Sequence, residues 1–121
     1  MADAPIMIVT GGSRGIGAGI ARLAGERGYD VCVNYAAAAD RAEAVAEEIR
    51  GRGRRAITVQ ADISKPEDVE RLFVETDSGL GGLDVLVNNA GISVEVPLAD
   101  HEVDAVRRMI DTNLLGPMLT T

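Results

Sequence analysis

The sequence predicts an α/β fold: a doubly wound parallel sheet with helices on both faces. Three observations predict it. Short apolar runs alternate with longer amphipathic stretches along the chain, and glycines separate many of them. This alternation calls for right-handed crossovers that bring the strands into one parallel sheet, in the order 3-2-1-4. Hydrophobic residues make up 46% of the 121 residues with almost no aromatic residues, so the core must be aliphatic.

Four apolar runs are expected to form the strands. The first is ended by the turn Thr10-Gly11-Gly12, and the second contains the only cysteine, Cys32, which we expect to be a buried and inert thiol. In the order 3-2-1-4 the fourth strand lies at an edge, where it leaves an apolar segment exposed. The expected strand ranges are 6–9, 31–34, 56–59 and 84–87.

A helix is expected after each strand. Glycine adopts the left-handed conformation of a helix C-cap, so glycines should end the first three helices. In chain order these are Gly28, the pair Gly51/Gly53, and the glycines of 79–82. The third helix should begin at a capping box, Ser64–Glu67, the fourth near Asp100, and residues 112–121 look like the start of another.

Each helix is expected to turn an apolar face toward the sheet, because its apolar residues recur at helical spacing. In chain order the inward residues are Ile16, Ile20, Leu23 and Ala24; Val45 and Ile49; Val69, Leu72 and Phe73; and Val103, Val106 and Ile110.

Charge and composition exclude several classes of function. The net charge is −7 with no basic tract, which argues against nucleic acid or an anionic membrane as a partner. No apolar run is long enough to span a bilayer and the N-terminal residues do not resemble a signal peptide, so we expect a cytoplasmic protein. The single histidine, His101, is expected to be solvated, and together with one cysteine it makes no metal site.

A glycine-rich turn follows the first expected strand and opens the first helix. Gly11, Gly15 and Gly17 have the spacing Gly-x-x-x-Gly-x-Gly. A pyrophosphate needs close access to backbone amides, which side chains at these positions would prevent, and the helix N-terminus adds partial positive charge. The context of strand, turn and helix therefore predicts a dinucleotide site.

A second motif, Asn88-Asn89-Ala90-Gly91, follows the fourth strand beside the switch point where doubly wound sheets bind ligands. Together with Thr10–Gly17 it resembles the short-chain dehydrogenase/reductase family of the classical type, over essentially the whole chain. The resemblance implies a Rossmann-type fold and an NAD(P)-dependent oxidoreductase. Such an enzyme transfers hydride between a nicotinamide cofactor and a carbonyl or alcohol substrate.

The resemblance also implies which residues bind the cofactor. Asp62 would meet the adenine edge, and Arg14 can reach a 2′-phosphate. The second strand ends without the carboxylate that usually holds the ribose of NAD, so NADP(H) is favoured over NAD(H), although Ala36 stands where NADP-preferring relatives often have a basic residue. The implied cofactor-binding residues are Gly11, Ser13, Arg14, Gly15, Ile16, Gly17, Asn34, Tyr35, Ala36, Asp62, Ile63, Asn89, Ala90 and Gly91.

Of the family's catalytic residues, only Asn113 has a counterpart in these 121 residues; in the family it holds a water that extends the proton relay. The only tyrosines are Tyr29 and Tyr35 and the only lysine is Lys65, so no Tyr-x-x-x-Lys pair is present. We therefore expect residues 1–121 to form an incomplete dinucleotide-binding domain that lacks the catalytic and substrate half and is inactive alone.

Two other interpretations stay open. In the first, the chain is a non-catalytic nucleotide-binding module, which binds cofactor without turnover. In the second, it is a fragment whose open sheet edge is completed by another chain. The family implies a small-molecule carbonyl or alcohol substrate and a homo-oligomer, and loop details favour the group around oxoacyl-carrier-protein reductases and sugar or polyol dehydrogenases.

Overall fold

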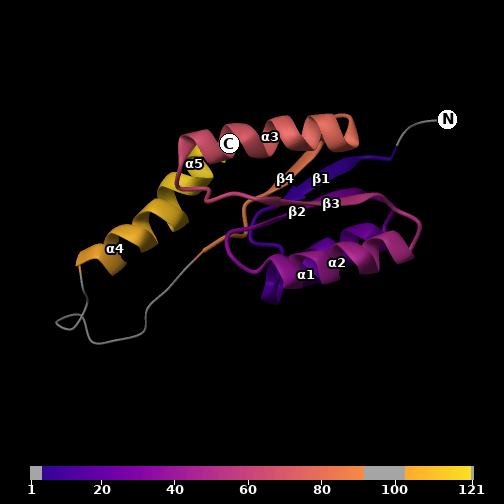
Figure 1. Cartoon of the computed structure of the whole chain (residues 1–121), viewed down its shortest axis with the longest axis horizontal. Helices are drawn as coiled ribbons and strands as arrows, with labels where there is room; N and C mark the ends of the chain where they lie inside the picture. Colours follow the sequence, from indigo (N-terminus) through magenta and orange to yellow (C-terminus); the bar gives the residue numbers. More distant parts are fainter. Residues whose placement is uncertain (1–3, 92–102, 121) are drawn as a thin grey trace.

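A computed structural model describes residues 4–91 and 103–120 of the chain. Its sheet is entirely parallel and has the strand order β3-β2-β1-β4, which confirms the predicted order (Figure 1). The strands are β1 (Ile6–Val9), β2 (Asp30–Tyr35), β3 (Ala56–Gln60) and β4 (Val85–Val87).

Helices lie on both faces of the sheet: α1 and α2 cover one face and α3 covers the other (Figure 1). The C-terminal helical segment contains a π-helical turn, η2, and its last part packs beside α3. The helices are α1 (Gly15–Glu26), α2 (Ala39–Gly51), α3 (Pro66–Leu80), α4 (Val103–Ile110), η2 (Asp111–Leu115) and α5 (Gly116–Thr120). The helical segment formed by η2 and α5 confirms the helix expected at the end of the chain.

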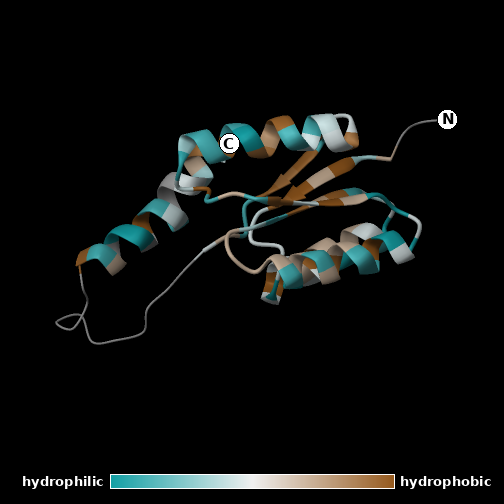
Figure 2. Ribbon diagram, viewed as in Figure 1, coloured by the Kyte–Doolittle hydropathy of each residue, from teal (hydrophilic) through white to brown (hydrophobic). Residues whose placement is uncertain are grey.

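The strands carry apolar side chains on both faces, as expected of a parallel sheet covered by helices. In β1, Met7 and Val9 pack in the core under α1 and α2, whereas Ile6 and Ile8 pack in the core under α3. Figure 2 shows the strands as the most hydrophobic layer, between helices whose outer faces are polar. The predicted inward residues of α2 and α3 are correct: Val45, Ile49, Val69 and Leu72 are buried, and Phe73 is partly buried.

The predicted inward face of α1 is wrong at two positions. Ile16 is 77% exposed and Leu23 is 49% exposed, whereas Ile20 is half-buried and only Ala24 is buried. Small residues form the buried face instead, namely Gly17, Ala18, Ala21, Ala24 and Gly25. The helix lies so close to its neighbours that a Cβ on Gly25 would be 3.0 Å from Ile49 of α2. Side-chain volume, more than hydropathy, therefore determines which face of α1 is buried.

The start of α3 differs from the predicted capping box. Lys65 occupies the N-cap position without a side-chain hydrogen bond, and Pro66 begins the helix. Ser64 does not cap the helix, because its hydroxyl donates to Oδ1 of Asp62 at 2.6 Å. The predicted end is correct, since Gly81 adopts the left-handed conformation with a φ of 93°.

For α4, the predicted burial of Val103 and Ile110 is wrong, because these side chains are 68% and 51% exposed. The expected helix start at Asp100 and the side chains of Val106 and His101 lie outside the described residues. At the sheet edge, β4 pairs with β1, and its three apolar side chains are only half-buried. Within residues 4–91 and 103–120 no strand covers its other edge, as predicted.

Cys32 is fully buried in β2, as predicted. Burial raises the pKa of its thiol to about 11; a hydrogen bond with Thr76 opposes this shift and the charge of Glu75 adds to it. The thiolate, which is the reactive form, is therefore suppressed at neutral pH.

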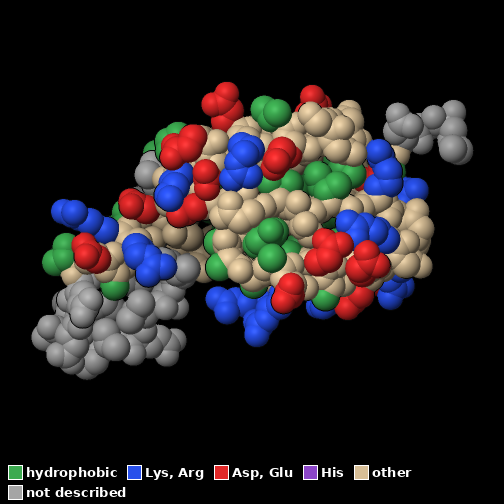
Figure 3. All heavy atoms as spheres, in the orientation of Figure 1, with side chains coloured by type: hydrophobic (Ala, Val, Ile, Leu, Met, Phe, Trp, Pro, Cys, Tyr) green, Lys and Arg blue, Asp and Glu red, His purple; other side chains and the backbone are tan. Residues whose placement is uncertain are grey.

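The surface carries interspersed charges of both signs. On the face shown in Figure 3, acidic and basic side chains alternate over α2 and α3 without forming a basic patch. Several of these charges pair between helices, for example Arg22 of α1 with Glu48 of α2 and Arg52 with Glu26. None of the described helices is both long and apolar enough to cross a membrane.

A buried carboxylate, Asp30, joins three segments at the amino end of the sheet. It accepts hydrogen bonds from the backbone N–H and the guanidinium of Arg55, which also donates to the Leu80 carbonyl at 2.8 Å. We expect Asp30→Ala to lower the free energy of unfolding by about 2 kcal/mol, because it removes the charged hydrogen bonds by which a buried carboxylate joins β2 to Arg55. Urea unfolding followed by circular dichroism measures this loss.

The matched control is Glu48→Ala, which removes an exposed ion pair with Arg22. This substitution should cost less than about 0.5 kcal/mol, since exposed ion pairs contribute little to stability. Equal losses for the two variants would contradict the role given to Asp30.

Candidate cofactor-binding site

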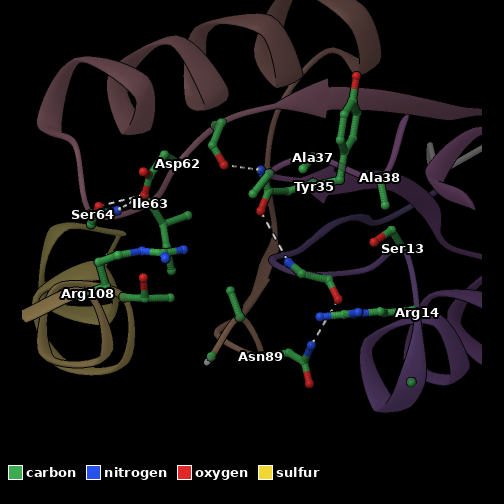
Figure 4. A pocket seen from close by; sticks show the side chains of 18 of the residues that line it. Ser13, Arg14, Tyr35, Ala37, Ala38, Asp62, Ile63, Ser64, Asn89 and Arg108 are labelled. Carbon is green, nitrogen blue, oxygen red and sulfur yellow. Dashed lines mark hydrogen bonds between the residues drawn. The ribbon is translucent and has the colours of Figure 1, made fainter. Parts of the chain in front are cut away.

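A cavity of about 470 Å³ opens at the carboxyl ends of the strands (Figure 4). It lies where the strand order reverses at β1, which is the ligand site of doubly wound sheets. Every predicted cofactor-binding residue lines it except Ile16 and Gly17. The lining residues that the sequence analysis did not identify are Ala37, Ala38, Ala61, Ser64, Arg108, Asp111 and Thr112.

The glycine turn between β1 and α1 forms one wall of the cavity. Gly11 and Gly15 have φ values of 63° and 58°, in the left-handed region that favours glycine. A Cβ on Gly11 would also lie 2.9 Å from the Cα of Ala90. Arg14 occupies the N-cap position of α1 and makes no side-chain capping bond. Because the first amides of a helix have no acceptor within it, the α1 N-terminus can bind an anion.

Gly17 is the third glycine of the turn motif and lies in a closely packed position. It lies outside the cavity lining, and a Cβ there would overlap the carbonyl oxygen of Gly11 and the side-chain nitrogen of Asn89. The absence of a side chain at Gly17 therefore lets α1 pack closely against the two motifs.

Thr10 connects the glycine turn to the second motif. Its buried hydroxyl donates to the Val87 carbonyl at 3.2 Å and accepts from the backbone N–H groups of Asn89 and Ala90 at 2.9 and 3.0 Å. Asn89 returns the connection, because its side-chain nitrogen donates to the carbonyl oxygens of Thr10 and Gly11. The two sequence motifs are thus one hydrogen-bonded unit.

Asn34, at the end of β2, is buried and bonded to three backbone groups. Its Oδ1 accepts from the N–H of Gly11 at 3.2 Å, and its Nδ2 donates to the carbonyl oxygens of Val59 and Ala61. The side chain therefore holds the glycine turn against the ends of β2 and β3. Tyr35 and Ala36, which follow, line the cavity.

Asp62 lies at the β3 end of the cavity. It accepts two hydrogen bonds from Ser64, and its own backbone N–H donates to Asp68 at 2.8 Å. Burial alone would raise the pKa of the Asp62 carboxyl, but the bonds from Ser64 and the charges of Lys65 and Arg108 outweigh burial and lower it. Asp62 is therefore ionised at neutral pH and acts only as a hydrogen-bond acceptor.

Two arginines enter the cavity from opposite sides: Arg14 from the glycine turn and Arg108 from α4 (Figure 4). Arg14 belongs to the glycine-turn motif and is predicted from it, whereas Arg108 lies outside both motifs and is not predicted. The sequence pattern from which Arg108 could be predicted is helical spacing. Asp111 and Thr112 follow Arg108 by three and four residues, so the three residues share one helix face.

Asn113 lies in η2 and is exposed. It does not line the cavity in the described part of the chain, but its Oδ1 lies 3.2 Å from the point that a Cβ on Gly91 would occupy. The structure therefore brings the predicted catalytic asparagine next to the second motif. Asn88 of that motif also accepts a hydrogen bond from Thr120 of α5, which ties the C-terminal helix to the end of β4.

Comparison with known proteins identifies the family. The family model described as short chain dehydrogenase matches residues 5–121, and the chain therefore belongs to the short-chain dehydrogenase family. Among curated relatives, it is 46% identical over 109 residues to a 3-oxoacyl-(acyl-carrier-protein) reductase of Staphylococcus epidermidis and 42% identical over 114 residues to versicolorin reductase 1 of Aspergillus parasiticus.

The chain spans less than half the length of these relatives: the matches cover 90% and 94% of this chain but only 45% and 44% of theirs. A crystal structure of a Burkholderia cenocepacia short chain dehydrogenase in complex with NADP has a TM-score of 0.93 at 40% identity. It matches 98% of this chain and 48% of its own. A blue fluorescent protein from a metagenomic library, in complex with NADPH, has a TM-score of 0.89 at 38% identity, with coverages of 98% and 49%.

The packing of Gly17 can be tested against Gly19, two residues along the same helix. We expect Gly17→Ala to destabilise the fold by about 2 kcal/mol, because the new methyl group overlaps backbone and Asn89 in a closely packed junction. A Cβ on Gly19 meets nothing within 4 Å, so Gly19→Ala should stabilise the helix by about 0.5 kcal/mol. Thermal unfolding of the two variants measures the difference, and a tolerated Gly17→Ala would refute the close packing.

Proposed function

We propose that this chain is the cofactor-binding half of an NADP(H)-dependent oxidoreductase that acts on a small carbonyl or alcohol substrate. The observation that carries the proposal is the cavity at the switch point, which joins the uncapped N-terminus of α1, the glycine turn and Arg14. The similarity to the 3-oxoacyl reductase supports a carbonyl substrate.

The residues present fit a dinucleotide. The left-handed glycines of the turn, Gly11 and Gly15, keep its backbone open beside the first amides of α1, where a pyrophosphate would accept hydrogen bonds. Asp62 would accept a hydrogen bond from the adenine amino group, because it is ionised and cannot donate. Ala90 and Gly91 offer small surfaces to the ribose on the β4 side. When bound, the nicotinamide supplies or accepts hydride at C4.

The preference for NADP(H) over NAD(H) rests on two features. No carboxylate follows β2 among the described lining residues of the cavity; the residues there are Asn34, Tyr35 and Ala36, and the side chain of Asn34 is held by backbone groups. Arg14 lies in the turn beside them, where its guanidinium can pair with a 2′-phosphate. The NADP and NADPH complexes of the two similar structures support the same preference.

We assign Asn113 to the proton relay of the complete enzyme, in which a tyrosine and a lysine supplied outside residues 1–121 would move the proton. The position of Asn113 beside Gly91 supports this assignment. The same proposal includes a cytoplasmic location, a homo-oligomer, and residues 1–121 as the first half of one dinucleotide-binding domain. The half-length coverage of the relatives supports the last point.

The 121-residue chain should bind NADPH without consuming it. The chain contains no tryptophan whose emission could report binding, so the fluorescence of the nicotinamide itself is measured. We expect this fluorescence to increase to saturation when the chain is titrated into NADPH. With a 3-oxoacyl thioester added, the absorbance of NADPH should not fall, since no Tyr-x-x-x-Lys pair is available to move the proton. Absence of binding would contradict the proposed function, whereas steady oxidation would contradict only the assignment of the proton donor to residues beyond 121.

Arg14 should distinguish the two cofactors. We expect Arg14→Ala to weaken NADPH binding about tenfold or more and NADH binding less than about twofold, because only NADPH has the 2′-phosphate. The matched control is Arg27→Ala, at the opposite end of α1 and outside the cavity lining, which should change neither affinity. Equal losses for NADPH and NADH in Arg14→Ala would show that Arg14 binds a group the two share.

A further inference from the structure

We propose that Arg108 of α4 holds the adenine base, stacking its guanidinium on the ring at the end of the cavity marked by Asp62. This inference rests on the proposed function, because it assigns one part of the same dinucleotide to a residue outside both motifs. It makes α4 a wall of the adenosine subsite.

The direction of the dinucleotide places its base on this side. The α1 N-terminus, which takes the pyrophosphate, lies at β1 in the centre of the sheet order β3-β2-β1-β4. The adenosine end must then extend across the ends of β2 and β3, toward Asp62, while the nicotinamide end extends toward β4. Arg108 reaches the cavity on the Asp62 side, and Arg14 stands on the opposite side (Figure 4).

The surroundings of Arg108 suit a flat base better than a phosphate. Its side chain extends toward Asp62 and Ile63 (Figure 4), and its charge is among the causes that lower the pKa of Asp62. The nearby carboxylate would repel a phosphate, whereas a guanidinium beside a carboxylate still presents a planar face for stacking. Ile63, whose side chain packs against Gly116 of α5, lines the same end of the cavity with an apolar residue.

The helix face supports this position. Arg108, Asp111 and Thr112 all line the cavity and follow each other at helical spacing. The neighbouring Arg107 is exposed, as Arg108 is, but it does not line the cavity. The chain therefore offers two adjacent arginines on one helix, of which only one faces the cavity.

The test compares Arg108→Ala with Arg107→Ala in the 121-residue chain, by fluorescence titration with NADPH and NADH. We expect Arg108→Ala to weaken both cofactors by a similar factor of about five to ten, because both carry adenine. Arg107→Ala should leave both affinities unchanged. Arg108→Lys should remain nearly as weak as Arg108→Ala, since lysine keeps the charge but loses the planar group.

Each result decides between the two proposals. If the wild-type chain binds neither cofactor, the proposed function fails and the assignment of Arg108 fails with it. If the wild type binds and Arg108→Ala binds equally well, only the assignment of Arg108 is overturned. A loss confined to NADPH, or full rescue by Arg108→Lys, would mean that the arginine acts by charge on a phosphate, which also overturns stacking on the base.

Discussion

The site depends on the hydrogen-bonded junction between Thr10 and Asn89. Thr10 follows β1 and Asn89 follows β4, and the two residues, 79 positions apart in sequence, share two hydrogen bonds. The side chain of Asn89 donates a third hydrogen bond to the carbonyl of Gly11. This junction aligns the two strands at the switch point, fixes the carbonyl of Gly11 and thereby sets the shape of the glycine turn. Since Gly17 packs against the same junction, the start of α1 is positioned by it as well. The N-terminal end of α1 is therefore positioned by side chains of the junction itself.

The amino end of the sheet is stabilised by carboxylates, whereas the carboxyl end forms the cavity. At the amino end, Asp30 joins β2 to Arg55, and Asp84 accepts from the N–H of Ile6 at 2.9 Å, so carboxylates stabilise the edge opposite the cavity. At the carboxyl end, small residues leave open space, and the carboxylates that line the cavity, Asp62 and Asp111, belong to the segment after β3 and to η2 rather than to the glycine turn. The overall charge of −7 therefore does not prevent a local anion site at the N-terminus of α1.

Much of this arrangement follows from local sequence. Alternating apolar runs determine the strands, and the turn glycines determine where the helices end, so the sheet order and most of the cavity lining are predictable. Local sequence patterns do not predict features that depend on contacts between segments far apart in the sequence. The inward face of α1 is chosen by the space available beside Ile49, which Ile16 and Leu23 could not reveal. Ser64 bonds to Asp62 instead of capping α3, and Arg108 of α4 lines the cavity although it lies outside both sequence motifs.

Both polar atoms of the Asn34 side chain are engaged in hydrogen bonds to the backbone, and this affects which residues of the site can change in evolution. Its amide joins the glycine turn, β2 and β3, so exchange of this residue disturbs the framework before it alters any contact with a ligand. Tyr35 and Ala36 carry no comparable set of bonds to the glycine turn among the interactions of the described chain. Evolution or engineering of cofactor choice therefore has freedom at these two positions, one and two residues away from a position where it has almost none. Neighbouring residues at the end of one strand can thus change at very different rates.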